Sequence, residues 1–192
     1  MKKFLCLLLV MIICISLVAC TKSPKEEPVT LGSTIDLEYV NMTLDAFEIS
    51  TEYSFETTDN SSGTLSTYES SIKCSKDMKL ICLKGKFINK TQKGVLPSKN
   101  PIYGELEVNG NTYKTKMECY IPENYKSVYQ LAPLRTADYY LYAEVPVAVA
   151  DAIESCKLTI GLTEDLNVSE KVSKPEDNDV LYLLETIPAN QQ

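Results

Sequence analysis

A run of residues with a two-residue period constrains the fold of this chain more than any other feature. The run is 79–89, KLICLKGKFIN. One side of it is apolar apart from a glycine and comprises Ile81, Leu83, Gly85 and Phe87. The other side carries Leu80, Cys82, Lys84 and Lys86. Because side chains alternate between the two faces of a sheet, this run predicts a strand with one face in the core.

The segment 102–117 predicts a β-hairpin with a defined register. Asn109-Gly110 is the preferred pair for a two-residue type I′ turn, in which both residues need positive φ. The register that follows pairs Val108 with Asn111, Leu106 with Tyr113, Ile102 with Met117, Glu105 with Lys114 and Tyr103 with Lys116. This single register groups apolar side chains on one face and pairs opposite charges on the other.

Further short strands are expected along the rest of the chain. Alternation predicts strands at 138–145, 156–162 and 180–186, and one or two strands with a bulge or bend within 34–50. Residues 51–71 are rich in Ser, Thr, Asp and Gly and predict a long loop or a mobile hairpin tip. Pro146 favours a short helical segment after it. About eight strands with almost no helix predict an all-β, antiparallel β-sandwich.

The N-terminal segment has the composition of an export signal. Two lysines precede an apolar run from Phe4 to Ala19, which is shorter than the roughly 20 residues of a membrane-spanning helix. The run ends in Leu-Val-Ala-Cys20, which resembles the lipobox of bacterial lipoproteins. That resemblance implies cleavage before Cys20 and attachment of a diacylglycerol to its thiol. An uncleaved membrane anchor and plain secretion are the alternatives.

A lipid on Cys20 determines the expected organisation of the chain. Residues 1–19 are the signal peptide, and 20–33 are the lipidated cysteine followed by a flexible tether that spans roughly 40 Å when extended. The sandwich occupies 34–187, and 188–192 form a free tail. Two acyl chains anchor a protein durably. We therefore expect attachment to the cell membrane, on its extracytoplasmic face.

Composition excludes several classes of function. The net charge is −7, and removal of a signal that carries two lysines and no acid makes it −9. An acidic surface disfavours nucleic acid as a partner. The sequence contains no histidine, the residue best suited to acid–base catalysis near neutral pH and a common metal ligand. We therefore expect no catalytic residues, no metal site and no cofactor.

Four of the seven cysteines belong to the expected domain. They are Cys74, Cys82, Cys119 and Cys156. An even number in an exported chain favours two disulfides, for which three pairings are possible. The strand phases slightly favour Cys74–Cys82 with Cys119–Cys156, and four free buried thiols are the alternative.

Tyrosine is abundant, with 12 copies, and is well suited to interfaces. A contact surface could be built from Tyr103, Tyr120, Tyr125, Tyr129, Tyr140 and Tyr142. Because strands also favour aromatic residues, these tyrosines could instead serve only the sheets.

Several stretches together resemble a known family. They are LEYVNMTLDAFEIS, LICLKGKFINKTQK, PIYGELEVNGNTY, LAPLRTADYYLYAEVP and CKLTIGL. They are similar to the immunoglobulin-like extracellular domain of bacterial lipoproteins, which is related in fold to a secreted immunoprotective antigen. The resemblance implies an immunoglobulin-like sandwich without established catalysis. We expect a non-catalytic interaction module that binds a protein, peptide or envelope component at the cell surface. A cell-envelope enzyme or a protease-inhibitor-like protein of the same fold is the alternative.

Overall fold

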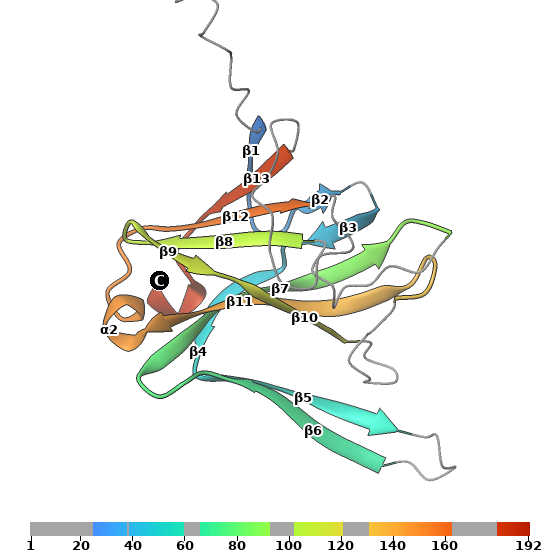
Figure 1. The fold of residues 1–192 in the computed structure, drawn as a ribbon, viewed down its shortest axis with the longest axis horizontal. Coiled ribbons are helices and arrows are strands. Elements are labelled where there is room, and N and C mark those ends of the chain that lie inside the picture. The colour runs from blue at the N-terminus through green and yellow to red at the C-terminus, as the bar shows by residue number, and fades with distance from the viewer. Residues whose placement is uncertain (1–24, 38, 60–65, 93–101, 121–130, 163–179) are drawn as a thin grey trace, which may run out of the picture.

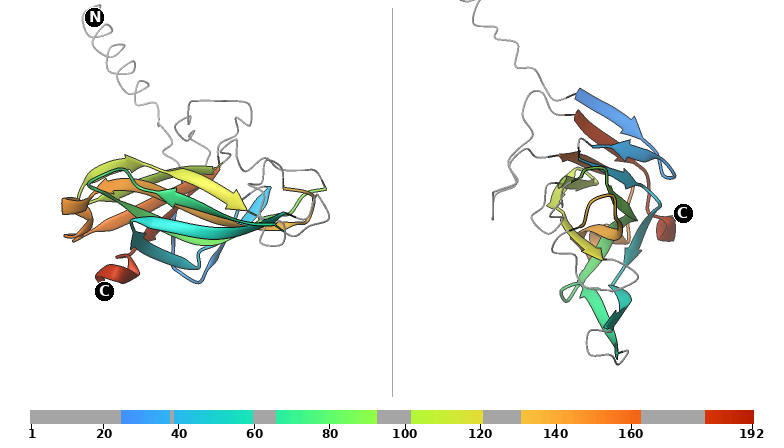
Figure 2. Two further views of the ribbon diagram at one scale, coloured as in Figure 1. Left: turned by 90° about the horizontal axis from the view of Figure 1, so that it is seen from below. Right: turned by 90° about the vertical axis from the view of Figure 1, so that its right-hand side faces the viewer.

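Two β-sheets packed face to face form the body of the molecule, and a third sheet of two strands lies outside them (Figures 1 and 2). The computed structural model describes residues 25–37, 39–59, 66–92, 102–120, 131–162 and 180–192. The predicted signal peptide and Cys20 lie outside these ranges. The β-sandwich predicted from the alternating runs is confirmed.

The first sheet, sheet A, has five strands. Their order is β1 (Lys25–Val29), β13 (Val180–Glu185), β12 (Cys156–Leu162), β8 (Ile102–Val108) and β9 (Asn111–Lys114). All neighbours are antiparallel except β1 and β13, which run parallel.

The second sheet, sheet B, is built on two long central strands. The order is β10 (Lys116–Tyr120), β11 (Thr136–Pro146), β7 (Met78–Asn89), β3 (Val40–Thr43) and β2 (Thr34–Asp36), and β4 (Ala46–Ser50) continues alongside β7 after β3. The segment 34–50, expected to hold one or two strands, holds three, and the predicted bend lies between β3 and β4. There Asp45 N donates to Lys84 O at 2.9 Å and Lys86 N donates to Thr43 Oγ1 at 2.7 Å.

The two remaining strands form a hairpin that we call the arm. It consists of β5 (Glu52–Asp59) and β6 (Ser66–Lys73), paired from Glu52↔Lys73 to Asp59↔Ser66. Figures 1 and 2 show the arm leaving the sandwich below sheet B. The expectation of a long loop over 51–71 was therefore wrong, whereas the alternative, a hairpin, is what this segment forms. Cross-strand pairing accommodates the Ser- and Thr-rich sequence because threonine and aromatic residues suit strands.

Two short helices complete the described chain. Helix α2 (Val147–Ala150) begins directly after Pro146, as predicted. The 3₁₀ helix η2 (Ala189–Gln191) falls in the segment expected to be a free tail. That expectation was wrong because Gln191 Nε2 donates to Ala150 O at 3.0 Å and Asn190 Nδ2 donates to Ile49 O on β4.

The main core lies between the sheets. The apolar face of β7 is buried as predicted, with Ile81, Leu83 and Phe87 no more than 1% exposed. Alternate residues of β11 join the same cluster, namely Tyr139, Leu141, Ala143 and Val145. Sheet A contributes Leu106, Leu158, Ile160 and Leu184. Because one face of each strand is buried in this single cluster, apolar and polar residues alternate along the sequence.

The register predicted for the hairpin holds only near its turn. Asn109 and Gly110 have φ of 49° and 77°, and pairing is confirmed from Val108↔Asn111 to Glu105↔Lys114. Beyond it the pairs of Ile102 with Met117 and Tyr103 with Lys116 were wrong. Thr115 Oγ1 donates to Gly104 O at 2.7 Å, and the chain then passes into sheet B as β10.

The predicted tether is also shorter than expected. Its residues 25–29 form β1, the outermost strand of sheet A. The polar composition of this stretch suggested a flexible segment, but pairing with β13 supplies its backbone hydrogen bonds, and Val29 packs against the main core.

Candidate functional site

The base of the arm packs on the outer face of sheet B, where aromatic, apolar and charged side chains meet in one cluster. The ring of Tyr53 on β5 stacks on that of Tyr140 on β11, with centroids 5.3 Å apart and planes at 29°. Lys84 Nζ on β7 lies 5.0 Å from the Tyr53 centroid and 5.9 Å from that of Tyr140. Such cation–π contacts favour an ordered lysine.

Glu48 on β4 joins the lysine and the arm. Its carboxylate lies 2.6 Å from Lys84 Nζ, and its backbone oxygen accepts a hydrogen bond from Tyr53 OH at 3.2 Å. Burial raises the pKa of Tyr53 far above its usual range, so the phenol stays protonated and donates. The base of the arm is therefore fixed to β4 and β7 by polar contacts as well as by packing.

An apolar layer lies beneath these polar groups. It is a second buried cluster, separate from the main core, made of Tyr53, Ile72, Leu80, Cys82, Tyr140 and Tyr142. Leu80 and Cys82 were predicted on the solvent side of β7, and both are fully buried because the arm covers them. Sheet B is thus covered on both faces where the arm begins.

The turn after β6 is anchored to β11. Ser75 donates to Glu144 Oε2 twice, from its backbone N at 3.1 Å and from its hydroxyl at 2.6 Å. These hydrogen bonds, the side-chain one first, lower the pKa of the Glu144 carboxyl. Both ends of the arm are therefore held: β5 by Tyr53 and the end of β6 by Ser75.

The predicted tyrosine contact surface does not form as expected. Tyr140 and Tyr142 are only 8% and 7% exposed, so they belong to the cluster under the arm and are removed from that surface. Tyr103 lies on β8 and Tyr120 on β10, on different sheets. Tyr125 and Tyr129 lie outside the described residues. Alternation along β11 could not distinguish a solvent face from one covered by another hairpin.

The predicted disulfides are absent, because all four cysteines of the domain are free thiols. Cys119 lies on β10 of sheet B, paired with Tyr139, whereas Cys156 lies on β12 of sheet A, paired with Val108 near α2. Cys74 lies beside Met78, because its Sγ donates to Met78 O at 3.0 Å. Met78 precedes Cys82 on β7 by four residues. Four strand residues span about 13 Å, beyond the reach of a disulfide.

Three of these thiols are buried and poorly acidic. Burial raises the pKa of Cys156 to about 12 and that of Cys82 and Cys119 further still. A thiolate is the reactive form of cysteine, so these groups are protonated and unreactive at neutral pH. Their packing resembles that of small apolar residues.

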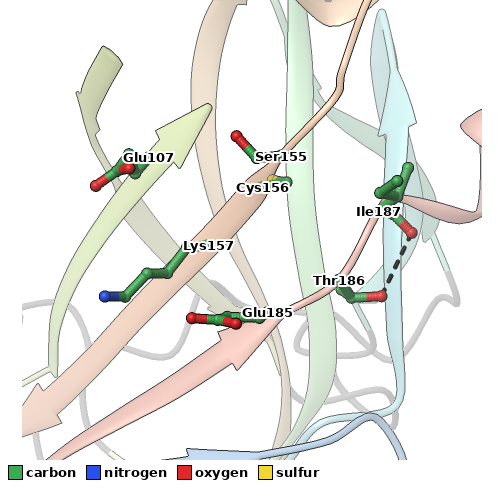
Figure 3. A pocket seen from close by; sticks show the side chains of 7 residues that line it. All are labelled: Glu107, Ser155, Cys156, Lys157, Glu185, Thr186 and Ile187. Carbon is green, nitrogen blue, oxygen red and sulfur yellow. Dashed lines mark hydrogen bonds between the residues drawn. The ribbon is translucent and has the colours of Figure 1, made fainter. Parts of the chain in front are cut away.

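A shallow pocket lies at the end of sheet A (Figure 3). Its volume is about 360 Å³, and it is lined by Glu107, Ser155, Cys156, Lys157, Glu185, Thr186 and Ile187. Lys157 on β12 is the cross-strand neighbour of Glu107 on β8 and of Glu185 on β13, so a lysine and two glutamates line the same pocket. The protonated Cys156 offers no nucleophile here, and the pocket presents hydrogen-bonding groups of both charges.

A second shallow pocket of about 400 Å³ lies between β1 and β2. Glu27 and Pro28 line it from β1, and Asp36 from β2. Tyr182 on β13 donates its hydroxyl to Asp36 O at 3.0 Å, and this contact links sheet A to β2, an edge strand of sheet B. Its carboxylates have lysine partners, Lys25 for Glu27 and Lys90 for Asp36.

Within the described parts of the chain, no three acidic, cysteine or histidine side chains gather in a way that could hold a metal ion. Among the helices described, none has the length and apolarity needed to cross a membrane.

The sequence suggested a hairpin over 51–71 only as an alternative to a loop, and neither of its strands nor Tyr53 was predicted. The signal was the alternation of Tyr53, Phe55 and Thr57 within 52–59, which is typical of a strand. The surrounding Ser, Thr and Asp residues obscured it.

Comparisons with known proteins support the fold. A β-sandwich protein from Clostridium difficile has a TM-score of 0.55 and 15% identity, with 84% of this chain and 95% of that protein covered. A Listeria monocytogenes protein of unknown function has a TM-score of 0.48 and 10% identity, covering 86% and 83% of the two chains. A candidate lipoprotein from Bacillus subtilis has a TM-score of 0.39 and 8% identity, with 78% of this chain and 37% of that protein covered.

Only the first of these scores exceeds 0.5, and at 15% identity the likeness concerns the fold alone. No family model matches the chain, and no curated protein matches it.

Proposed function

We propose that this protein is a non-catalytic binding module, held at the extracytoplasmic face of the cell membrane by a lipid on Cys20, that engages a protein, peptide or envelope component through the arm. The observation that carries the proposal is the construction of the arm. Its base is fixed on sheet B by Tyr53 and Ile72, and its strands continue away from the sandwich (Figure 1).

A hairpin with a fixed base is suited to recognition. Ordering a loop on binding costs conformational entropy, and an arm already paired over eight residues per strand reduces that cost. The hydrogen bonds of Tyr53 OH with Glu48 O and of Ser75 with Glu144 fix where the arm leaves the body. An arm that served only stability would gain most by packing along its whole length.

The side-chain chemistry favours binding over catalysis. The chain has no histidine, and the three buried thiols are held in their protonated form. The pocket in Figure 3 is lined by one lysine and by the glutamates of its two neighbouring strands, a set of charged groups without an activated nucleophile.

Site-specific photocrosslinking in cells tests the role of the arm. A photoreactive amino acid is placed at Glu56 or Glu69, which are cross-strand partners in the arm. The matched controls are Thr112 and Lys114, exposed positions on β9 of sheet A. We expect a defined adduct from the arm positions and none from β9. The same adducts from β9, or none from the arm, would contradict the proposal.

The anchor is tested separately. Metabolic labelling with a fatty-acid analogue should mark the wild-type protein, and Cys20→Ala should remove the label and release the protein from the membrane fraction. Cys74→Ala, a change at a half-buried cysteine of the domain, is the control and should leave both unchanged.

A further inference from the structure

Strand β1 fixes the chain to the sandwich much closer to Cys20 than the sequence suggested. It pairs with β13 from Lys25↔Val180 to Val29↔Leu184. The attachment continues after the strand, because Gly32 N donates to Leu44 O at 2.7 Å and Leu44 N donates to Ser33 O at 2.9 Å. From Lys25 onward, the chain is therefore part of the folded body.

The sequence of β1 is suited to an edge position. Proline has no N–H, so within a sheet it belongs on an edge strand with its nitrogen turned away from the neighbouring strand. Pro28 is in the outermost strand of sheet A, so its nitrogen faces outward and that of Glu27 faces β13. A further strand cannot pair fully with an edge that contains proline and charges. Strand β1 thus ends the sheet and leaves its outer edge available to another surface.

The distance from Cys20 to β1 limits where that edge can lie. Only four residues separate Cys20 from Lys25, and this link spans about 17 Å when fully extended. The thirteen-residue tether expected from the sequence would have allowed the sandwich to rotate freely above a membrane. A link this short holds the β1–β13 edge near the point of attachment.

The arm lies on the other side of the molecule. In Figure 1 and in the right-hand view of Figure 2, β1 and β13 are at the top and the arm is at the bottom. We infer that β1 is an orienting strand, which holds the β1–β13 edge against the lipid surface that carries Cys20 and points the arm away from it. This inference rests on the lipid anchor of the proposed function and assigns the partner of this edge as the membrane surface.

Energy transfer to the membrane tests the orientation. The full-length lipidated protein is reconstituted in phosphatidylcholine vesicles that contain an acceptor lipid. A donor fluorophore is placed at Asp36, which lines the shallow pocket between β1 and β2, or at Glu69 in the arm. We expect strong transfer from Asp36 and weak transfer from Glu69. Equal transfer from the two positions, in protein that is bound to the vesicles, would overturn the inference.

A pair of proline substitutions tests β1 itself. Glu27→Pro removes an N–H that faces β13, whereas Glu26→Pro removes one that faces outward beside Pro28. In the Glu27→Pro variant we expect equal energy transfer from the donors at Asp36 and Glu69. In the Glu26→Pro variant we expect transfer to remain stronger from Asp36. Unchanged transfer in Glu27→Pro would refute the role of β1.

An insertion before β1 provides a second test, which does not depend on whether the proline variant folds. Ten Gly and Ser residues placed between Pro24 and Lys25 lengthen the link and leave β1 intact, and we expect the difference between donors to be lost. A retained difference would overturn the inference. Wild-type protein that fails to bind vesicles would instead refute the anchor, and with it the proposed function.

Discussion

Gly85 allows β7 to pair with both β3 and β4 along the same edge. A Cβ at this position would lie 1.9 Å from Thr43 O, the atom that accepts a hydrogen bond from Tyr139 OH at 2.7 Å. The bend between β3 and β4 brings this carbonyl over the glycine. The absence of a side chain at residue 85 is therefore what permits the strand change on that side of sheet B.

Replacement of Gly85 by alanine should destabilise the protein strongly. The two nearest atoms, Thr43 O and Thr43 C, are backbone and cannot move aside, so we expect a loss of about 3 kcal/mol in the free energy of unfolding. Gly110→Ala is the control, because it meets nothing within 4 Å and suffers only from its φ of 77°, a cost of roughly 1–2 kcal/mol. Urea unfolding of both variants measures the difference, and equal losses would contradict the clash.

All four thiols of the domain should be detectable as free thiols without a reductant. In the folded protein we expect Cys74, the half-buried one, to react first with a thiol reagent, because the other three are buried. After unfolding in urea under non-reducing conditions, all four should react. A count of two or none would reveal disulfides and contradict the free-thiol structure.

At the scale of elements, the arm depends on a small contact. Tyr53 contributes the ring that stacks on Tyr140, the face that meets Lys84 and the hydroxyl that bonds to Glu48 O. The rest of the arm is held mainly through its own pairing. The base residues therefore decide whether the arm stays on the sandwich.

Truncating Tyr53 should test this dependence. Tyr53→Ala removes the packing and leaves a cavity over Leu80 and Cys82, so we expect a loss of about 3 kcal/mol in the free energy of unfolding. Tyr53→Phe removes only the hydrogen bond to Glu48 O and should cost about 1 kcal/mol. Chemical denaturation distinguishes them, and similar losses would show that packing is not the main contribution.

At the scale of the whole molecule, sheet B is the most protected part. Its two central strands are covered by sheet A on one face, and on the other face the arm covers Leu80 and Cys82 of β7 and Tyr140 and Tyr142 of β11. The edge strands β1 and β9 have one neighbour each in sheet A. Burial and pairing thus fall from the centre of the molecule to its edges.

Hydrogen exchange should follow this gradient. We expect amides of β7 and β11 around Cys82 and Tyr142 to exchange only through global unfolding, and those of β1 and β9 to exchange through local opening. Mass spectrometry of peptic fragments resolves these strands. Exchange in β1 as slow as in β7 would show that the edge is more rigid than its pairing indicates.

The local sequence pattern was sufficient to predict much of the fold but little of the cluster at the base of the arm. The strands at 79–89, 138–145 and 156–162, the Asn109-Gly110 turn and the short helix after Pro146 were all predicted, because period and turn chemistry depend on nearby residues. The base of the arm was not predicted, since Tyr53 and Tyr140 are far apart in the sequence and acquire their roles only by stacking.

Which segments become strands, and which of their faces is apolar, could thus be read from the amino-acid order alone. The sheet that each strand joins follows instead from the packing of distant segments. Residues 25–29, expected to be tether, form the edge of sheet A. The chain passes from sheet A to sheet B after Thr115. The second face of β7 is buried under the arm. Alternation is a property of neighbours in the chain, whereas pairing and burial depend on surfaces that exist only once distant segments have met.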